Sequence, residues 1–562
     1  MLWFGALGLR GLFSPDEGRY ALIPKEMLAR GDWVTPHLNG LVYLEKPPLQ
    51  YWATAVAFKA LGEEAFAARL WPALCGLGAA LLAGWFAWRR GGPVAGLAAL
   101  AMLGSSLLFF LFSQVATLDM GLAFFLTLAL VGLMQAEAGR VRADGSHRLR
   151  WLLAAWVALA LAFLSKGLVA FVLPGLALAL YMVLRRDWRL PLRLHLLRGL
   201  AIVLLLCAPW MMAAQWAHGE FFDFFIVHEH FARFGSDVHR RTGAWWYFIA
   251  IVLVGMLPWS AFWSWSSRGA RSGPAVGGPA FSDLAGRDGR VLASDCSPVF
   301  DERLFMRIWI AVVVIFFSLS RSKLPGYVLP VFPFIAIQIG LFVAAAPPVQ
   351  LARRCWSGVL VAAILVVVAL VMASTGIDDV PPALAQDFLP WALTAAFLLA
   401  SASLAARPLF RRGRVSAALL VLGFCSLVGW QTLLSGATVF EASYSARAFA
   451  AEVNRSLAAG ERSGTWYSVG TFDNSFGFYM GRELVLVAYR DELDLGLAID
   501  PERGIDTLEE FVERWVADEE AGAMMQPRTY DALSARGLPM AVVARDARRV
   551  FVLRQRLQTS LL

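Results

Sequence analysis

The sequence predicts an α-helical integral membrane protein with about thirteen transmembrane helices and a small C-terminal α/β domain. Hydrophobic residues make up 58% of the 562 residues and charged residues only 16%, whereas a soluble globular protein carries about 25% charged residues. Apolar runs of about 20 residues, the length that crosses a bilayer, recur through most of the chain. From about residue 436 they give way to short alternating segments. This composition excludes a soluble enzyme, a disordered protein and a fibrous protein.

Twelve apolar runs predict membrane spans. They cover residues 65–88, 93–112, 117–137, 151–164, 167–184, 198–217, 244–264, 304–319, 326–345, 355–374, 389–406 and 415–434. Residues 1–13 are apolar except for Arg10 and too short to span alone, so we interpret them as the end of a first helix, shortened by a late start codon. They lack the basic n-region and cleavage site of a signal peptide.

The loops between these runs differ in charge. Alternate loops are rich in arginine, which predicts that they lie on the cytoplasmic side: Arg89 and Arg90; Arg140, Arg142, Arg148 and Arg150; Arg185, Arg186, Arg189 and Arg193; Arg353 and Arg354; Arg407, Arg411, Arg412 and Arg414. Residues 375–388 contain no Lys or Arg but three aspartates, so they lie outside. An odd number of spans then puts the C-terminus outside as well. The net charge of +8 reflects these loops and does not indicate a nucleic-acid partner.

Two domains follow from this pattern. Residues 1–435 form a transmembrane catalytic domain with outer loops at 14–64 and 218–243, and residues 436–562 form an extracytoplasmic domain. In the latter, residues 483–489, 541–544 and 550–553 are predicted strands and residues 508–516 a helix. Residues 266–303 are rich in Gly, Ser and Pro, which predicts a flexible cytoplasmic connector. The five cysteines form no CxxC pair, so neither a disulfide framework nor a zinc cluster is indicated.

The remaining charged residues gather at the outer ends of the predicted helices and in the outer loops. They are Asp16, Glu17, Arg19, Lys25, Glu26, Glu45, Lys46, Asp119, Lys166, His228, Glu229, His230, Arg233, Arg321 and Lys323. A proton-coupled transporter keeps ionisable groups near the bilayer centre and often has inverted repeats, and the sequence has no such repeat. A site at the outer membrane face suits chemistry on a lipid head group.

The first outer loop contains two candidate motifs. Asp16 and Glu17 are adjacent carboxylates before an amphipathic stretch, and they fit either a catalytic site or the capping of a helix N-terminus. Lys46 precedes two prolines, which restrict its backbone. It fits either a phosphate-binding cation or a lysine that extends to the membrane interface.

Three further segments carry candidates. Asp119 begins a helix at the outer face, where it either caps the helix or holds a sugar hydroxyl or amine. His228 and His230 are two residues apart, the wrong spacing for one helix face, so a metal site there needs a ligand from elsewhere, such as Glu45; otherwise they are interfacial histidines. The planar guanidinium of Arg233 matches phosphate oxygens.

The segment Ser320–Pro330 places Arg321, Lys323 and the Tyr327 hydroxyl at an outer helix start. Cations at an outer position are exceptions to the positive-inside rule, by which Lys and Arg are more frequent in cytoplasmic loops. Either an anionic lipid head group or pairing with Asp16 or Asp119 explains them. Carboxylates beside cations and a phenol are suited to holding a lipid phosphate as a leaving group while a sugar carbon with oxocarbenium character is attacked.

These residues, in this order, resemble the membrane glycosyltransferases of the GT-C fold that use polyprenyl-phosphate sugars. The matching motifs are Asp16-Glu17, Lys46-Pro47-Pro48-Leu49, Asp119 and Lys323-Leu324-Pro325-Gly326-Tyr327. Length, span number and the C-terminal domain are most similar to the lipid A aminoarabinose transferase branch. The protein O-mannosyltransferases share the first-loop motifs but fit the C-terminal half less well.

The resemblance implies a function and roles for residues. Asp16, with Glu17 and Asp119, would be catalytic; Lys46, Arg233, Lys323 and Tyr327 would bind the donor phosphate; Glu45 and His228 would hold a divalent metal such as zinc. The reaction would move 4-amino-4-deoxy-L-arabinose from undecaprenyl phosphate to a phosphate of lipid A, with inversion, at the periplasmic face of the bacterial inner membrane. The alternatives are a transferase that glycosylates protein Ser/Thr or another glycan, a transporter of lipid-linked sugars, and a structural subunit.

Overall fold

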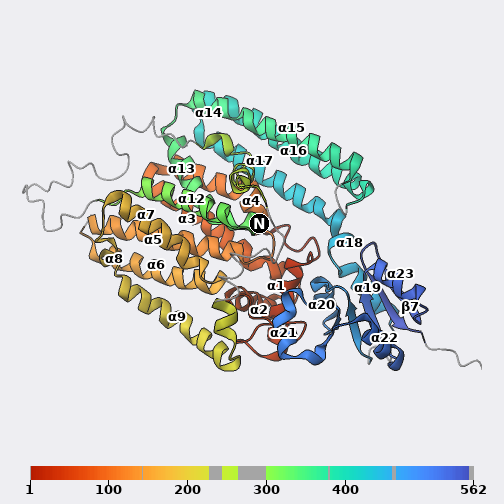
Figure 1. The fold of residues 1–562 in the computed structure, drawn as a ribbon. Helices are drawn as coiled ribbons and strands as arrows, with labels where there is room; N and C mark the ends of the chain where they lie inside the picture. The colour runs from red at the N-terminus through yellow and green to blue at the C-terminus, as the bar shows by residue number, and fades with distance from the viewer. Residues whose placement is uncertain are drawn as a thin grey trace, which may run out of the picture.

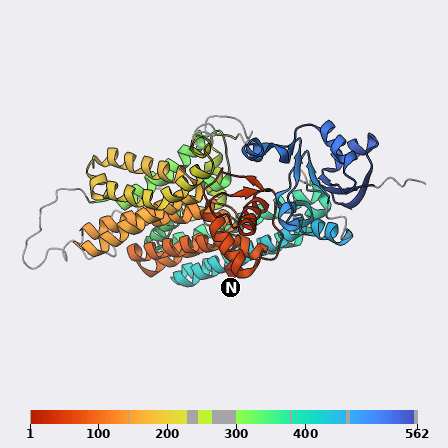
Figure 2. The ribbon, with the colours of Figure 1, turned by 90° about the horizontal axis from the view of Figure 1, so that it is seen from below.

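The computed structural model describes residues 2–141, 143–226, 243–263, 299–376, 380–457 and 464–555. Figure 1 shows a large body of helices with the C-terminal domain at one end, next to the N-terminal elements. Figure 2, turned by 90°, shows the same N-terminal elements, in red, beside the C-terminal domain, in blue. The predicted connector 266–303 lies almost wholly outside the described residues, which begin again at Val299.

Long helices follow the predicted apolar runs. They are α3 (Ala65–Ser105), α5 (Asp119–Val141), α6 (Gly145–Lys166), α7 (Val169–Arg185), α9 (Leu196–Ala217), α12 (Glu302–Leu319), α13 (Phe332–Ala345), α15 (Trp356–Thr375), α16 (Pro382–Arg411) and α17 (Val415–Gly436), with shorter helices α4 (Leu107–Ser113), α8 (Leu190–Arg193), α11 (Tyr247–Gly255) and α14 (Pro348–Arg354) between them. Within the described ranges, eight helices are long and apolar enough to cross a membrane. The prediction of a multi-pass helical membrane protein is thus confirmed, while the number thirteen stays a prediction.

The helices divide into buried and lipid-facing ones. Most side chains of α5 are buried, and α5 packs against both α3 and α6. In contrast, α9 and α15 expose large apolar side chains such as Leu204, Leu205 and Val367. Exposed apolar faces of this size are expected where lipid replaces water as the solvent. Helix α3 is interrupted at Gly92, whose φ of 78° is left-handed, at the boundary predicted between the first two runs.

The N-terminal segment differs from the prediction. It is not the end of a helix: a 3-10 turn, η1 (Leu2–Phe4), is followed by turns. The cause is competition for backbone groups. The Arg69 guanidinium donates to the carbonyl oxygens of Leu7 at 2.6 Å and of Arg10 at 2.9 Å, so these oxygens accept from a side chain instead of from helical N–H groups. At the start of the segment, the Trp3 indole N–H donates to Ala73 O at 2.8 Å.

The C-terminal domain is built on a six-stranded sheet in the order β5-β4-β3-β6-β8-β7. The first four strands in this order are parallel, whereas β8 pairs antiparallel with β6 and with β7. The strands are β3 (Trp466–Val469), β4 (Val485–Val487), β5 (Gly504–Ile505), β6 (Gly522–Met525), β7 (Met540–Arg545) and β8 (Val550–Arg554). The prediction of a small α/β domain is confirmed. The predicted segments correspond to β4, β7, β8 and α22 (Leu508–Ala517).

The two faces of this sheet have different partners. One face packs with Phe511 and Trp515 of α22 and with Leu533 of α23 (Pro527–Ala535). The other forms a single apolar cluster with the first outer loop, in which Phe476 and Phe551 lie with Tyr20. The remaining helices of the domain are α18 (Glu441–Tyr444), α19 (Arg447–Ser456), α20 (Asn474–Met480) and α21 (Asp494–Ile499). The C-terminal domain and the first outer loop therefore share a core.

Candidate active site

The first outer loop folds into two helices and a hairpin. Asn39 and Gly40 form the hairpin tip with φ of 57° and 74°, as a two-residue Asn-Gly turn requires. The second helix starts directly after Pro47 and Pro48. The elements are α1 (Asp16–Arg30), β1 (His37–Leu38), β2 (Leu41–Val42) and α2 (Leu49–Leu61). This compact unit carries both motifs predicted in the loop.

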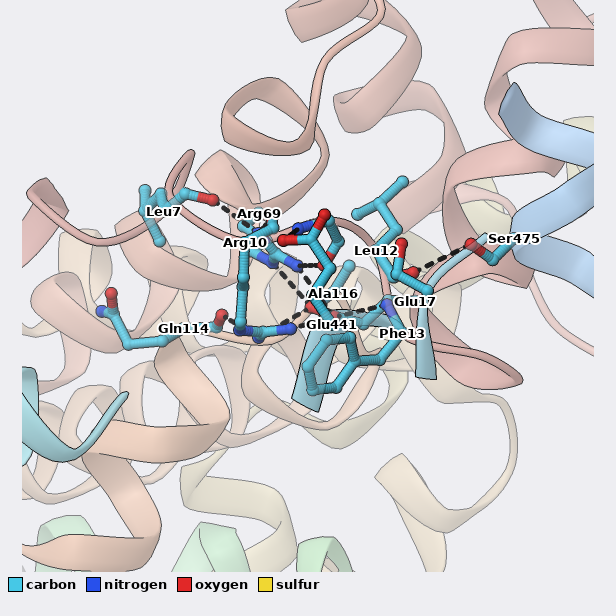
Figure 3. A network of polar contacts seen from close by, with 12 residues as sticks. Leu7, Arg10, Leu12, Phe13, Glu17, Arg69, Gln114, Ala116, Glu441 and Ser475 are labelled. Atoms are coloured by element: carbon cyan, nitrogen blue, oxygen red, sulfur yellow. Dashed lines mark hydrogen bonds and ion pairs between the residues drawn. The ribbon is translucent and has the colours of Figure 1, made fainter. Parts of the chain in front are cut away.

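Glu17 lies at the centre of a buried ion-pair cluster (Figure 3). It is 2% exposed. Arg69 donates to it twice, from Nε to Oε1 at 2.7 Å and from Nη2 to Oε2 at 2.9 Å, and Arg10 donates from Nη2 to Oε1 at 3.1 Å. Burial alone would raise the pKa of Glu17, but the two guanidinium groups hold that pKa well below its usual range. Its carboxylate is buried and both oxygens accept hydrogen bonds, as in a structural ion pair, and a catalytic role for Glu17 stays a prediction.

The same carboxylate connects two backbone segments. The backbone N–H of Phe13 donates to Glu17 Oε2 at 3.0 Å, and that of Ala116 donates to Oε1 at 3.2 Å. Phe13 precedes Asp16, and Ala116 precedes Asp119. Glu17 therefore ties together the segments that carry the two other predicted carboxylates.

Asp16 is the accessible carboxylate of the pair. Its side chain is 57% exposed, and Arg19 Nη1 lies 3.7 Å from its Oδ1. Burial raises the pKa of the nearby Tyr20 phenol, and the negative charges of Asp16, Asp119 and Glu45 raise it further. These three carboxylates, from separate parts of the sequence, thus lie within electrostatic reach of one phenol.

Asp119 is the first residue of α5, and it forms an ion pair with Lys166 at the end of α6. Lys166 Nζ also lies 5.0 Å from the centroid of the Tyr327 ring. Tyr327 belongs to η5 (Pro325–Val331), which approaches so closely that a Cβ on Gly326 would lie 2.7 Å from Asp119 Cγ. Only glycine fits there, which explains its place in the segment predicted from sequence.

Lys323 holds the turn that precedes η5. It is 9% exposed, and its Nζ donates to the carbonyl oxygens of Ser318 and Ser320, both at 3.0 Å. One of the two alternatives for Lys323 is an ion pair with Asp16 or Asp119. In the structure Lys323 instead donates to these backbone oxygens, and Lys166 pairs with Asp119. A donor-phosphate role for Lys323 stays a prediction.

Lys46 and Glu45 lie between the hairpin and α2. Lys46 Nζ donates to the Glu45 carbonyl at 3.0 Å and lies 3.6 Å from Glu45 Oε2. The Tyr43 hydroxyl donates to the same Oε2 at 3.1 Å. The Lys46 side chain is 17% exposed and that of Glu45 is 11% exposed. The ammonium group of Lys46 is therefore held in place within the loop.

Two predicted site residues, Arg233 and His228, lie outside the described residues. Across the ranges that the structure describes, no group of three or more His, Cys, Asp or Glu side chains has the arrangement of a metal site. Glu45 is the only one of the two predicted metal ligands that is described, and Tyr43 and Lys46 engage its carboxylate.

Sequence reasoning missed Arg10, Arg69 and Lys166 as parts of the site. Arg69 lies inside the first apolar run, and an ionisable residue within such a run is itself a sign of a functional or structural requirement. Arg10 is likewise the only charged residue before Asp16. Their partners have no signal in the sequence, because Arg69 and Glu17 are 52 positions apart.

The hairpin tip docks onto the C-terminal domain. Asn39 Nδ2 donates to Leu484 O at 2.7 Å, and Leu484 N donates to Asn39 Oδ1 at 2.8 Å. Behind the tip, the two carboxylate oxygens of Glu26 accept from the backbone N–H groups of Asn39 and Gly40, each at 2.8 Å. Glu26 therefore supports this contact between the two domains.

The protonation of Glu26 gives a pH-dependent prediction. Burial raises its pKa from 4.5 to about 7, although the N–H of Gly40 opposes the rise. The folded state thus binds the proton more tightly than the unfolded state, so this contribution to stability is complete below pH 4.5 and is lost as the pH rises through about 7. Melting temperatures of the wild type and Glu26→Gln, measured from pH 5 to 8, should differ in slope. Parallel curves would contradict the prediction.

Two family models match the chain. The model for the aminoarabinose transferase C-terminal domain matches residues 450–554, and that for dolichyl-phosphate-mannose-protein mannosyltransferase matches residues 2–225. Among curated proteins, the chain is 34% identical over 344 residues to an undecaprenyl phosphate-alpha-4-amino-4-deoxy-L-arabinose arabinosyl transferase of Pseudomonas aeruginosa, and 30% identical over 340 residues to the protein of that name in Edwardsiella ictaluri. Each alignment covers 59% of this chain and 56% of the relative, so the match spans little more than half the length of these relatives.

The similarity to solved structures extends over nearly the whole chain. The crystal structure of ArnT from Cupriavidus metallidurans bound to undecaprenyl phosphate aligns with a TM-score of 0.86 and 32% identity, covering 99% of this chain and 96% of that one. The apo state of the same protein aligns with a TM-score of 0.85. Helical body and C-terminal sheet domain are thus shared in one arrangement. The chain therefore belongs to the ArnT family of aminoarabinose transferases.

Proposed function

We propose that this protein transfers 4-amino-4-deoxy-L-arabinose from undecaprenyl phosphate to a phosphate of lipid A. The reaction takes place at the periplasmic face of the bacterial inner membrane. The observation that carries the proposal is the 32% identity over 99% of the chain to an ArnT structure with undecaprenyl phosphate bound. The outer-loop carboxylates beside Lys46 and Lys166 add the chemistry that such a reaction needs.

The reaction is a displacement at the anomeric carbon. An oxygen of the acceptor phosphate forms a bond to this carbon while the bond from the carbon to the donor phosphate oxygen breaks. The electron pair of the broken bond leaves with undecaprenyl phosphate, and the configuration inverts. The acceptor phosphate is already an anion near pH 7, so the reaction requires no strong general base.

The described residues divide the electrostatic work. Asp16 is exposed, and its carboxylate stabilises the positive charge that develops on the sugar or orients the acceptor. Lys46, held between Glu45 and two prolines, neutralises the donor phosphate, and Arg233 assists from the second outer loop. Asp119, paired with Lys166, is the second acid of the site. Glu17 positions the loop instead of reacting.

Replacing Lys46 with methionine tests the donor contact. A charge-assisted hydrogen bond contributes about 1.5–3 kcal/mol, so we expect the apparent KM for the lipid donor to rise at least about tenfold while the protein stays folded. Lys59→Met is the matched control, because Lys59 is an exposed lysine on the neighbouring α2. An unchanged KM in Lys46→Met would exclude the phosphate contact.

Mass spectrometry of lipid A tests the function as a whole. A strain that lacks its own transferase would carry this gene, the Asp16→Ala variant, or Glu63→Gln as a variant of an exposed carboxylate in the same loop. We expect a mass increase of one aminopentose with the wild type and Glu63→Gln, and none with Asp16→Ala. Unmodified lipid A in the presence of well-expressed wild type would overturn the acceptor, and glycosylated proteins or other glycans would then be analysed.

A further inference from the structure

The segment that leads to Asp16 is bonded to the C-terminal domain. Leu12 N donates to the Tyr479 hydroxyl oxygen at 2.9 Å. The Ser475 hydroxyl donates to Leu12 O at 3.0 Å, and Figure 3 shows this second bond. Two residues on, Ser14 N donates to Tyr444 O at 2.8 Å. The backbone groups of Leu12 and Ser14 thus bond to residues more than 400 positions away, whereas Phe13 between them donates to Glu17 of the adjoining α1.

A second contact lies at the start of α20. Asp473 accepts from the backbone N–H groups of Ser475 and Phe476 at 2.9 and 3.1 Å, and Ser14 Oγ joins it through a hydrogen bond to the same carboxylate. On its other side, Asp473 Oδ2 lies 3.1 Å from Nη1 of Arg549, whose side chain is 4% exposed. The buried arginine fixes Asp473, and Asp473 fixes Ser14.

The two helices approach closely just after Asp16. A Cβ on Gly18 would lie 2.4 Å from Ser475 N, so the backbones of α1 and α20 are in direct contact. Asp16 lies between the bonded segment and this contact. Since its own side chain is mostly exposed, with Arg19 at 3.7 Å, the backbone on either side determines where its carboxylate lies.

We propose that the C-terminal domain is a structural part of the active site, with Ser475 and Tyr479 as positioning residues that hold the backbone of residues 11–18 and thereby Asp16. The proposal rests on the proposed function for the role of Asp16. It gives the C-terminal domain a task in catalysis other than binding the acceptor.

Kinetics of Ser475→Ala and Tyr479→Phe test the proposal. Each change removes one hydrogen bond to Leu12 and adds no bulk. Ser475→Ala also removes the acceptor of Ala446 N, so Tyr479→Phe serves as the second, independent probe of the Leu12 contact. We expect kcat to fall about 10- to 100-fold, the size of a small misplacement of a reacting group, with the KM for the lipid donor unchanged. In an Asp16→Asn background the same changes should have little further effect, because the residue that they position is already lost.

Thr507→Ala is the matched control. Thr507 caps α22 in the same domain by accepting from Glu510 N at 3.2 Å, and α22 lies on the opposite face of the sheet. Its kcat per folded molecule should equal that of the wild type. A full loss of kcat by Ser475→Ala that persists in the Asp16→Asn background would overturn the positioning role.

Hydrogen–deuterium exchange separates this proposal from the proposed function. The amides of Leu12 and Ser14 should exchange faster in Ser475→Ala and Tyr479→Phe than in the wild type or Thr507→Ala. Unchanged exchange would overturn the proposal whatever the substrate is. In another outcome, the amides exchange faster in the two variants although the wild-type protein transfers no aminopentose. That outcome would support the contact and refute only the proposed function.

Discussion

Asp16→Asn is expected to lower the rate of aminopentose transfer at least about 100-fold, the usual cost of removing a group aimed at developing charge. Asparagine keeps the size of aspartate but replaces one acceptor oxygen with an NH2 donor and removes the negative charge, so the variant tests the charged carboxylate without a change of size. The fold should persist, since Asp16 is 57% exposed with one ion-pair contact at 3.7 Å, and exposed pairs contribute little to stability. The measurement is the transfer rate with purified lipid donor and acceptor, followed by mass spectrometry.

The control for this result is Glu63→Gln. Glu63 lies in the same outer loop, its side chain is 44% exposed, and it pairs with Lys25 at 3.2 Å, so like Asp16 it is an exposed carboxylate beside one basic side chain of α1. Its variant should transfer at the wild-type rate. If Asp16→Asn transferred normally, the charged-carboxylate role would be wrong and Asp119 would become the leading candidate.

Glu17→Gln should have the largest effect on stability. The change leaves two buried guanidinium groups without their counter-charge, and breaking a buried pair in this way costs roughly 3–5 kcal/mol. The yield of folded protein and its unfolding temperature in detergent should both fall. The transfer rate per folded molecule should fall as well, because the N–H groups of Phe13 and Ala116 lose a charged acceptor.

Glu137→Gln separates these two effects. Glu137 lies in the same helix as Asp119 but towards its opposite end, it is 1% exposed, and its Oε2 lies 3.2 Å from Nε of Arg193. Its loss should also destabilise the protein, less than Glu17→Gln because Arg193 keeps its hydrogen bonds to Asp187, while leaving the rate per folded molecule unchanged. Equal losses of rate in both variants would mean that the Glu17 cluster acts through stability alone.

Composition and patterning were sufficient for the membrane helices, because bilayer thickness alone demands long apolar runs. They failed where tertiary partners decide. Strand β6 has the sequence Gly-Ala-Met-Met, which carries no β-branched residue and no alternation, yet it pairs with β3 and β8 on its two sides. The N-terminal segment is apolar enough for a membrane helix, but its carbonyl oxygens at Leu7 and Arg10 accept hydrogen bonds from Arg69.

The candidate site likewise combines residues that the sequence indicated with contacts that only the fold reveals. Asp16, Lys46 and Asp119 became candidates because polar side chains at the outer ends of apolar runs are conspicuous, and their roles stay predictions. The distinct fates of Asp16 and Glu17 were not predictable, since adjacent carboxylates look alike in sequence and only the fold exposes one and buries the other. The pairing of Asp119 with Lys166 likewise required the packing of α5 against α6.

The shared core of the first outer loop and the C-terminal domain has a consequence for biosynthesis. Ser14 and Ser475 are 461 positions apart, and at about 5–20 residues per second the ribosome needs roughly 20–90 seconds to make the intervening chain. For that interval the apolar side chains of α1 lack the part of their core that the C-terminal domain supplies. The enzyme therefore completes its folding only at the end of its synthesis. Chaperones that bind loops during membrane insertion should bind this loop early in that period.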